Sequence, residues 1–270
     1  MRLASRAAPE LPPEDPELAF YARTMRSLHQ ARVPFLVAGA AVLQHHTGLC
    51  RDTKDLDLFI HERDLERALN ALDARGMHTV VAFPHWLAKA YDGDKFVDLI
   101  YNSGNGATPV DELWFQHASA GTLLGLPVLF CPAEETIWSK AFVMERERYD
   151  GADIAHLLAA RARDLDWKRL VWRFGRFWRV LLSHLVLFGF IYPDLARNIP
   201  AGVMDELLER LRVERQIVTR ERVCLGTLFS REQYLIDLEA GRRDGRLPPF
   251  GRMHPIDITA WTAAMNRKDA

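Results

Sequence analysis

Two patterns of apolar and polar positions divide the chain of 270 residues. Up to residue 131, short apolar runs alternate with amphipathic stretches, whereas beyond it apolar residues recur mainly at helical spacing. The first pattern predicts helices at 16–33, 40–48 and 62–76, and strands at 34–38, 53–60, 78–83, 126–131 and in a hairpin over 86–102. The second predicts helices over 133–165, with a loop near 149–151, and over 167–195 and 202–216.

These patterns give a plan of four parts. Residues 1–15, rich in Pro and Glu, are predicted to be a disordered lead-in, and residues 16–131 an α/β domain. Residues 132–235 are predicted to be a helical domain, and residues 236–270 an irregular tail that caps the helical region. The expected fold class is therefore α+β, with a sheet domain followed by a C-terminal helical region.

Composition indicates the compartment in which the protein works more clearly than its function. Hydrophobic residues make up 49% and charged residues 26%, and the formal net charge is -1, so nothing global demands a nucleic-acid or membrane partner. The three cysteines are far apart, which argues against a disulfide framework and favours a reducing cytoplasm. The apolar stretch 180–193 falls short of the ~18 residues of a membrane span, so we predict a buried helix and no membrane contact.

Two carboxylates stand in the strand predicted at 53–60. Asp55 and Asp57 point to one face because side chains alternate along a strand, while Leu56 and Leu58 point to the other. Carboxylates this close repel each other and ionise most readily with a cation between them. Mg²⁺ suits such a pair, because it fills its remaining positions with water and substrate phosphate oxygens. The alternative is a strand at the solvent edge that carries two surface aspartates.

Three neighbouring features favour a metal site. Gly39 lies where a buried strand turns into a helix, and the N–H groups of a helix N-terminus suit phosphate. Asp98 is a third carboxylate among apolar residues, which would allow two metals, or one metal and a base. Arg51 and Lys54 precede the first two acids and can pair with them or reach an anionic substrate.

The stretch VAGAAVLQHHTGLCRDTKDLDLFI, residues 37–60, resembles the signature of the nucleotidyltransferase superfamily, the DNA polymerase β-like fold. That signature joins a Gly-Ser or Gly-Gly pair at a strand–helix turn to an Arg-x-Thr-x-Asp-hydrophobic-Asp strand, with a third Asp on a later strand. The matching residues are Gly39, Ala40, Arg51, Thr53, Asp55 and Asp57, with Asp98 as the third acid. The resemblance covers roughly residues 34–101 and implies a mixed β-sheet flanked by helices.

The resemblance implies a Mg²⁺-dependent enzyme, with Mn²⁺ as an alternative ion, that transfers NMP from an NTP such as ATP and releases pyrophosphate. The implied metal ligands and catalytic acids are Asp55, Asp57 and Asp98, and the implied nucleotide-binding residues are Gly39, Ala40, Arg51 and Thr53. Ala40 departs from the family pattern, since it has no hydroxyl to offer the triphosphate. The backbone N–H groups at 39–41 remain, so weaker phosphate binding is expected.

A second resemblance lies downstream, in EETIWSKAFVMERERYDGADIAHLL, residues 134–158. This stretch is similar to the segment after the sheet in AbiEii-like nucleotidyltransferases, where a Ser-Lys pair on a helix precedes an Arg-rich stretch and an Asp-x-x-Asp. Lys140 matches the helix lysine, and Asp150 and Asp153 match the acids, which implies that Lys140 contacts nucleotide phosphates and assists catalysis. The alternatives are an exposed helix lysine, an N-cap at Asp150 and a first-turn aspartate at Asp153.

The acceptor stays open at this point. The resemblance admits a hydroxyl or phosphate of RNA, tRNA or a small molecule, and an antitoxin-like protein as a partner of a toxin-type enzyme. The stretch 167–179 interleaves arginines with aromatic residues, which can track a nucleic-acid backbone or can form an ordinary amphipathic helix. A catalytically silent nucleotide- or partner-binding module on the same fold is the alternative function, and convergence of the three acids would favour the enzyme.

Overall fold

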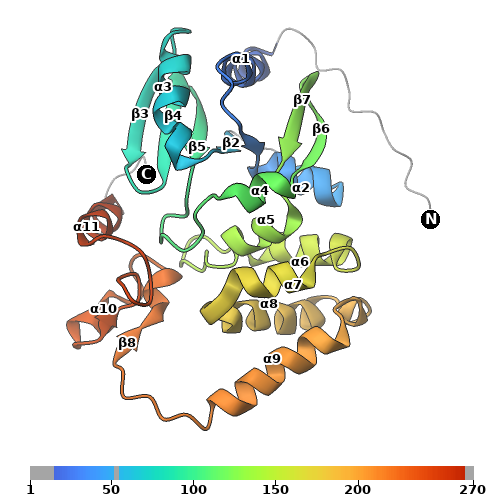
Figure 1. The fold of residues 1–270 in the computed structure, drawn as a ribbon, viewed down its shortest axis with the longest axis vertical. Helices are drawn as coiled ribbons and strands as arrows, with labels where there is room; N and C mark the ends of the chain where they lie inside the picture. Colours follow the sequence, from blue (N-terminus) through green and yellow to red (C-terminus); the bar gives the residue numbers. More distant parts are fainter. Residues whose placement is uncertain (1–14, 52–54, 265–270) are drawn as a thin grey trace.

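The computed structural model describes residues 15–51 and 55–264, and Figure 1 shows its fold. Its α-helices are α1 (Pro16–Gln30), α2 (Gly39–Thr47), α3 (Leu65–Asp73), α4 (Glu112–Gln116), α5 (Ala133–Lys140), α6 (Gly151–Arg161), α7 (Trp167–Phe174), α8 (Trp178–Ile191), α9 (Ala201–Glu214), α10 (Leu235–Glu239) and α11 (Pro255–Ala263). Its strands are β1 (Leu36–Val37), β2 (Leu56–Phe59), β3 (His78–Phe83), β4 (Leu87–Asp92), β5 (Lys95–Ile100), β6 (Ser119–Leu123), β7 (Leu126–Phe130), β8 (Val223–Cys224) and β9 (Arg243–Asp244). Thr53 and all but the last residue of the predicted lead-in lie outside the described residues.

A mixed seven-stranded sheet, in the order β3-β4-β5-β2-β1-β7-β6, forms the framework of the fold. Strand β2 pairs antiparallel with β1 and parallel with β5, and this parallel register sets Asp57 beside Asp98. Strand β4 pairs antiparallel with β5 and sets Lys89 on the other side of Asp98. Leu56 and Leu58 are buried on the opposite face of β2, as strand alternation predicts. The structure thus has the α+β class and the mixed, helix-flanked sheet that the sequence predicts.

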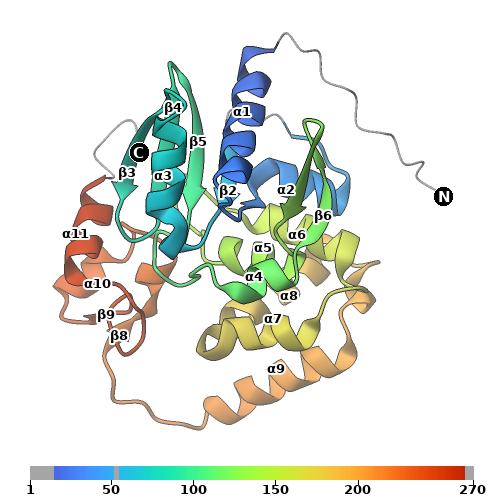
Figure 2. The same cartoon turned by 45° about the horizontal axis from the view of Figure 1, so that its top comes forward.

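Helices cover the sheet and extend from it. Helices α1 and α3 pack together over one face of the sheet, as Figure 2 shows, and α2 packs against β2 and α6. The helices from α5 to α9 follow below the sheet in Figure 1. One cluster of buried residues extends from Leu28 on α1 through Trp114 on α4 to Phe188 on α8, so the sheet and the helical region share a hydrophobic core.

The apolar stretch at the end of the predicted helix 167–195 forms α8. The segment Trp167–Ile191 is long and apolar enough to cross a membrane by length and composition alone. However, a 3-10 turn at Gly175–Phe177 separates α7 from α8, and Leu181, Leu185 and Phe188 are buried in the core. The buried helix expected at 180–193 is therefore present, although its last turn exposes Phe190 and Ile191.

Among the segments that differ from the sequence-based expectation, two lie at the edges of the sheet. The pattern predicts no element at 119–123, yet β6 pairs antiparallel with β7 in a hairpin. Ser, Ala and Gly are poor strand formers, so only the pairing with β7 explains this strand. The tail predicted to be irregular over 236–270 contains β9 and α11 within the described residues. Strand β9 pairs with β8, and α11 packs against β3, so the tail caps the edge of the sheet.

Candidate active site

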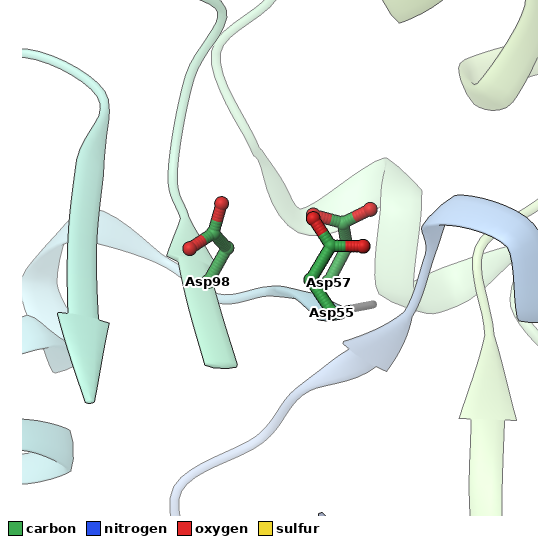
Figure 3. Close-up of side chains that lie close together, drawn as sticks. All are labelled: Asp55, Asp57 and Asp98. Atoms are coloured by element: carbon green, nitrogen blue, oxygen red, sulfur yellow. The ribbon is translucent and has the colours of Figure 1, made fainter. Parts of the chain in front are cut away.

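The three acids singled out in the sequence converge at the centre of the sheet, as Figure 3 shows. Asp55 and Asp57 come from β2 and the residue before it, and Asp98 comes from the parallel strand β5. One carboxylate oxygen from each lies within 4.8 Å of the other two, and all three side chains are half-buried. The first two acids therefore do not form the simple solvent-edge pair that was the alternative interpretation.

Gly39 provides the close approach that the site needs. It begins α2 with a φ of +58°, a left-handed conformation that favours glycine. A Cβ placed on this residue would overlap the carboxylate of Asp57, so any larger residue would displace that acid. Ala38 precedes the helix and has no side chain that caps it, so the first N–H groups of α2 depend on other acceptors. Ala40 lies half-buried in this first turn.

The mutual repulsion of the three carboxylates favours binding of a cation. Burial, together with the charges of Asp55 and Asp98, raises the pKa of Asp57 from 3.8 to about 7, although Lys140 opposes this effect. Burial also raises the pKa of Asp98. Lys89 limits that rise, because its Nζ donates to Oδ1 of Asp98 at 2.8 Å. The pattern that singles out the acids does not reveal Lys89; its signal is a lone cation between two alanines in a buried strand.

This donor set fits Mg²⁺. Clustered carboxylates offer the hard oxygen ligands that Mg²⁺ prefers, and the raised pKa of Asp57 shows that the three acids cannot all ionise easily without added positive charge. Mn²⁺ accepts the same kind of oxygen ligands.

A cluster of cations and acids lies beside the three aspartates. Lys140, at the end of α5, contacts Asp150 at 3.0 Å and Asp153 at 2.9 Å. Arg148 contacts Asp150 at 3.3 Å, and Arg51 contacts Asp153 at 2.6 Å. Burial alone would lower the pKa of Lys140, but the two aspartates raise it above its ordinary value. The Asp-x-x-Asp pair thus holds three cations, two of which, Lys140 and Arg148, line the cleft described below.

The structure departs from the alternative interpretation, a simple helix cap and an exposed lysine, at Asp150 and Lys140, and agrees with it at Asp153. Asp150 occupies the N-cap position of α6, yet its side chain makes no capping hydrogen bond and binds Lys140 and Arg148 instead. Asp153 does lie in the first turn of α6. Lys140 is not the exposed helix lysine of the alternative interpretation, since only 17% of its side chain is accessible. Arg148 was not singled out by the sequence, where its signal is its place in the Arg-containing stretch before Asp150.

A cleft of about 460 Å³ opens over the three acids. On the side of β1 and α2, its lining includes Gly39, Ser139, Lys140 and Arg148. On the side of β4 and β5, the lining includes Trp86, loop 102–105, residues 227–231 and Trp261. Because β1 and β4 lie on opposite sides of the pair β5-β2 in the sheet, the aspartates stand between these two walls. The sequence pattern does not predict the second wall.

The basic and aromatic stretch 167–179 is engaged within the fold. Arg169 contacts Glu135 at 2.5 Å, and Arg173 contacts Glu135 at 2.9 Å and Asp111 at 2.6 Å. Arg179 contacts Glu214 at 2.6 Å. Arg176 donates to the carbonyl of Pro249 and stacks on Phe250. These arginines serve internal ion pairs and hydrogen bonds. Arg173 is buried and Trp172 is 62% exposed, so the stretch departs from an ordinary amphipathic helix with buried aromatic rings and exposed arginines.

Comparison with known proteins returns nucleotidyltransferases. No family model and no curated protein sequence matches the chain. Solved structures that it resembles include ANT(2'')-Ia in complex with adenylyl-2''-tobramycin, at 14% identity over 74% of this chain and 99% of that chain, with a TM-score of 0.38. The lincomycin-bound lincosamide antibiotic adenylyltransferase LnuA is 13% identical over 54% and 98%, with a TM-score of 0.39. An antigenic nucleotidyltransferase-like protein from Paracoccidioides brasiliensis is 17% identical over 67% and 91%, with a TM-score of 0.40.

Proposed function

We propose that this protein is a Mg²⁺-dependent nucleotidyltransferase that transfers NMP from an NTP to a hydroxyl or phosphate of an acceptor and releases pyrophosphate. The observation that carries the proposal is the convergence of Asp55, Asp57 and Asp98, with carboxylate oxygens within 4.8 Å of one another, beneath a cleft. A silent binding module would not need three mutually repelling acids in this place. Their convergence therefore favours the enzyme over that alternative.

The residues around the acids supply the parts that this reaction requires. Asp55, Asp57 and Asp98 would hold the ion, which when bound would offset negative charge on the phosphates. The N-terminus of α2 at Gly39 and Ala40 would receive phosphate oxygens. Lys140 and Arg148 line the cleft near these acids and would stabilise the charge that develops as the bond to pyrophosphate breaks.

Two further assignments stay proposals. Thr53 lies outside the described residues, so its part in nucleotide binding rests on the resemblance alone. Arg51 is paired with Asp153, and we propose that it acts by holding that acid against Lys140.

The transfer step follows from this arrangement. An acceptor oxygen attacks the α-phosphorus, and the bond from that phosphorus to the oxygen shared with the β-phosphate breaks. Pyrophosphate leaves with the electron pair of that bond. When the acceptor is a hydroxyl, its proton would pass to a carboxylate. We assign this role to Asp98, because Lys89 donates to only one of its two oxygens.

Label transfer tests the proposed function. The protein is incubated with Mg²⁺ and each α-labelled NTP, in turn with total RNA, with the protein alone and with small-molecule acceptors. We expect label on one acceptor class and a loss of at least about 100-fold with Asp57→Ala. Asp94→Ala is the matched control, because the Asp94 side chain is 95% exposed at the turn between β4 and β5.

Two results would contradict the proposal. Equal transfer of label by the wild type and by Asp57→Ala would show that the three acids take no part in the reaction. Mg²⁺-dependent NTP binding without transfer to any acceptor would favour the silent binding module.

A further inference from the structure

The segment after α9 returns to the cleft and forms part of its wall. Leu228 and Arg231 line the cleft, although a long connection separates them from the helices that precede them. The Nδ2 of Asn105 donates to the carbonyl of Leu228 at 2.5 Å. The N–H of Met144 donates to the carbonyl of Phe229 at 3.3 Å. The returning segment is thus attached both to the loop after β5 and to the loop after α5.

Arg231 fastens this wall from within. Its Nε donates to Oε1 of Glu145 at 3.0 Å, and its guanidinium lies 4.3 Å from the ring centroid of Trp261. Only 20% of the Arg231 side chain and 24% of the Glu145 side chain are accessible. The cation is therefore used to hold the wall and is not presented to an incoming anion.

Trp261, on α11, closes the wall against the loop 102–105. A Cβ on Gly104 would overlap the indole of Trp261, so this glycine allows the ring to seat directly on the loop. Trp261 also meets Trp86 edge to face, with ring centroids 5.1 Å apart, and both rings line the cleft. This side of the cleft is consequently bounded by aromatic rings from Trp86, the residue before β4, and from Trp261 on α11.

The chemistry of this wall points to a class of ligand. Its lining joins aromatic rings to side-chain amides and hydroxyls, including those of Asn102, Ser103 and Ser230. Among the described residues that line this side, Arg231 is the cation, and Glu145 neutralises it. Nucleic-acid phosphates require unpaired cations, and none is found among the described residues of the returning segment that line the cleft. Aromatic rings with amides and hydroxyls suit a compact molecule that carries several hydroxyl groups.

We infer that the returning segment forms the acceptor subsite and that the acceptor is a small polyhydroxyl molecule, bound against Trp86 and Trp261 with one hydroxyl facing Asp98. This inference rests on the proposed function, since it names the acceptor of that transfer. The acceptor hydroxyl forms the new bond to the α-phosphorus, and pyrophosphate leaves as described above.

The test uses the full-length protein and two pools of acceptor. One pool holds neutral and amine-bearing saccharides and cyclitols, and the other holds total tRNA. Binding of an NTP with Mg²⁺ is measured first by calorimetry, and transfer of α-label to each pool follows. We expect label on a member of the first pool and none on tRNA.

Variants then locate the subsite. Trp261→Ala should raise the KM for the acceptor by at least about tenfold, while the KM for the NTP changes by less than about twofold. Trp261→Phe should restore most of the acceptor affinity, because it keeps an aromatic ring. Trp172→Ala is the matched control, since this tryptophan is 62% exposed on α7, and it should change neither constant.

The outcomes separate this inference from the proposed function. Label on tRNA, or equal rises in both KM values with Trp261→Ala, would overturn the inference alone. NTP binding with no transfer to either pool would also overturn the polyhydroxyl acceptor. Absence of Mg²⁺-dependent NTP binding by the wild type would overturn the proposed function first, and the acceptor subsite with it.

Discussion

Asp57→Asn in the metal-free protein should increase stability while it removes the proposed function. Burial and the neighbouring carboxylates of Asp55 and Asp98 raise the pKa of Asp57 from 3.8 to about 7. A raised pKa means that the folded state binds the proton more tightly than the unfolded state does. Protonation of Asp57 therefore stabilises the folded state. This stabilisation is complete below the pKa of the unfolded state and is lost as the pH rises through the pKa of the folded state.

The magnitude follows from the two pKa values. Each pH unit between 3.8 and about 7 contributes about 1.4 kcal/mol, so ionised Asp57 disfavours the folded state by up to about 4 kcal/mol at alkaline pH. Asparagine has nearly the same shape and does not ionise. The free energy of unfolding of Asp57→Asn, relative to the wild type, should therefore increase by roughly 2 to 3 kcal/mol between about pH 5 and about pH 8.

The assay is urea unfolding in the presence of EDTA at both pH values. Asp94→Asn is the control and should show no such increase, because the Asp94 side chain is 95% exposed. Addition of Mg²⁺ at alkaline pH should then narrow the difference in stability, with the wild type gaining about 2.7 kcal/mol at 100 times the dissociation constant and Asp57→Asn gaining little. A variant that is less stable than the wild type at alkaline pH without metal would refute the electrostatic reasoning.

Two further variants test the surroundings of the acids. Gly39→Ala should lose about 1–3 kcal/mol and most of its Mg²⁺ affinity, because it combines a φ of +58° with an overlap on Asp57. Gly48→Ala is the control: its φ is +74° with open space around it, so it should show only the cost of the backbone conformation. If Gly39→Ala and Gly48→Ala had equal effects in unfolding and in Mg²⁺ titrations, the overlap with Asp57 would be refuted. Lys140→Met should cost about 3–5 kcal/mol near neutral pH, because Asp150 loses a buried cation. Lys140 and Arg148 hold the pKa of Asp150 below its ordinary value of 3.8. The stability that this pairing provides is present above that value and is lost as the pH falls through the lower folded pKa, so an equal cost of Lys140→Met near neutral pH and in strong acid would contradict the pairing.

The local sequence was enough to predict strands β1 and β2 and the two acids, Asp55 and Asp57, at β2. Alternation of apolar and polar residues in β2 placed Asp55 and Asp57 on the face opposite Leu56 and Leu58, because a strand has a period of two. The turn at Gly39 was likewise predicted from the local sequence, whereas its close approach to Asp57 is a tertiary contact. The third acid was predicted as a residue, but its position beside Asp57 depends on the parallel pairing of β2 with β5.

The tertiary structure alone decided what surrounds those acids. Lys89 meets Asp98 through the register of β4 against β5, and Asn105 meets Leu228 across 123 residues of sequence. The wall formed by the end of the chain, with Trp261, has the same origin. Periodicity reports which face of an element is buried and says nothing about which distant segment covers that face. Contacts of this kind are set by packing of the whole chain, so they define the acceptor side of the cleft and could not be predicted from the sequence pattern.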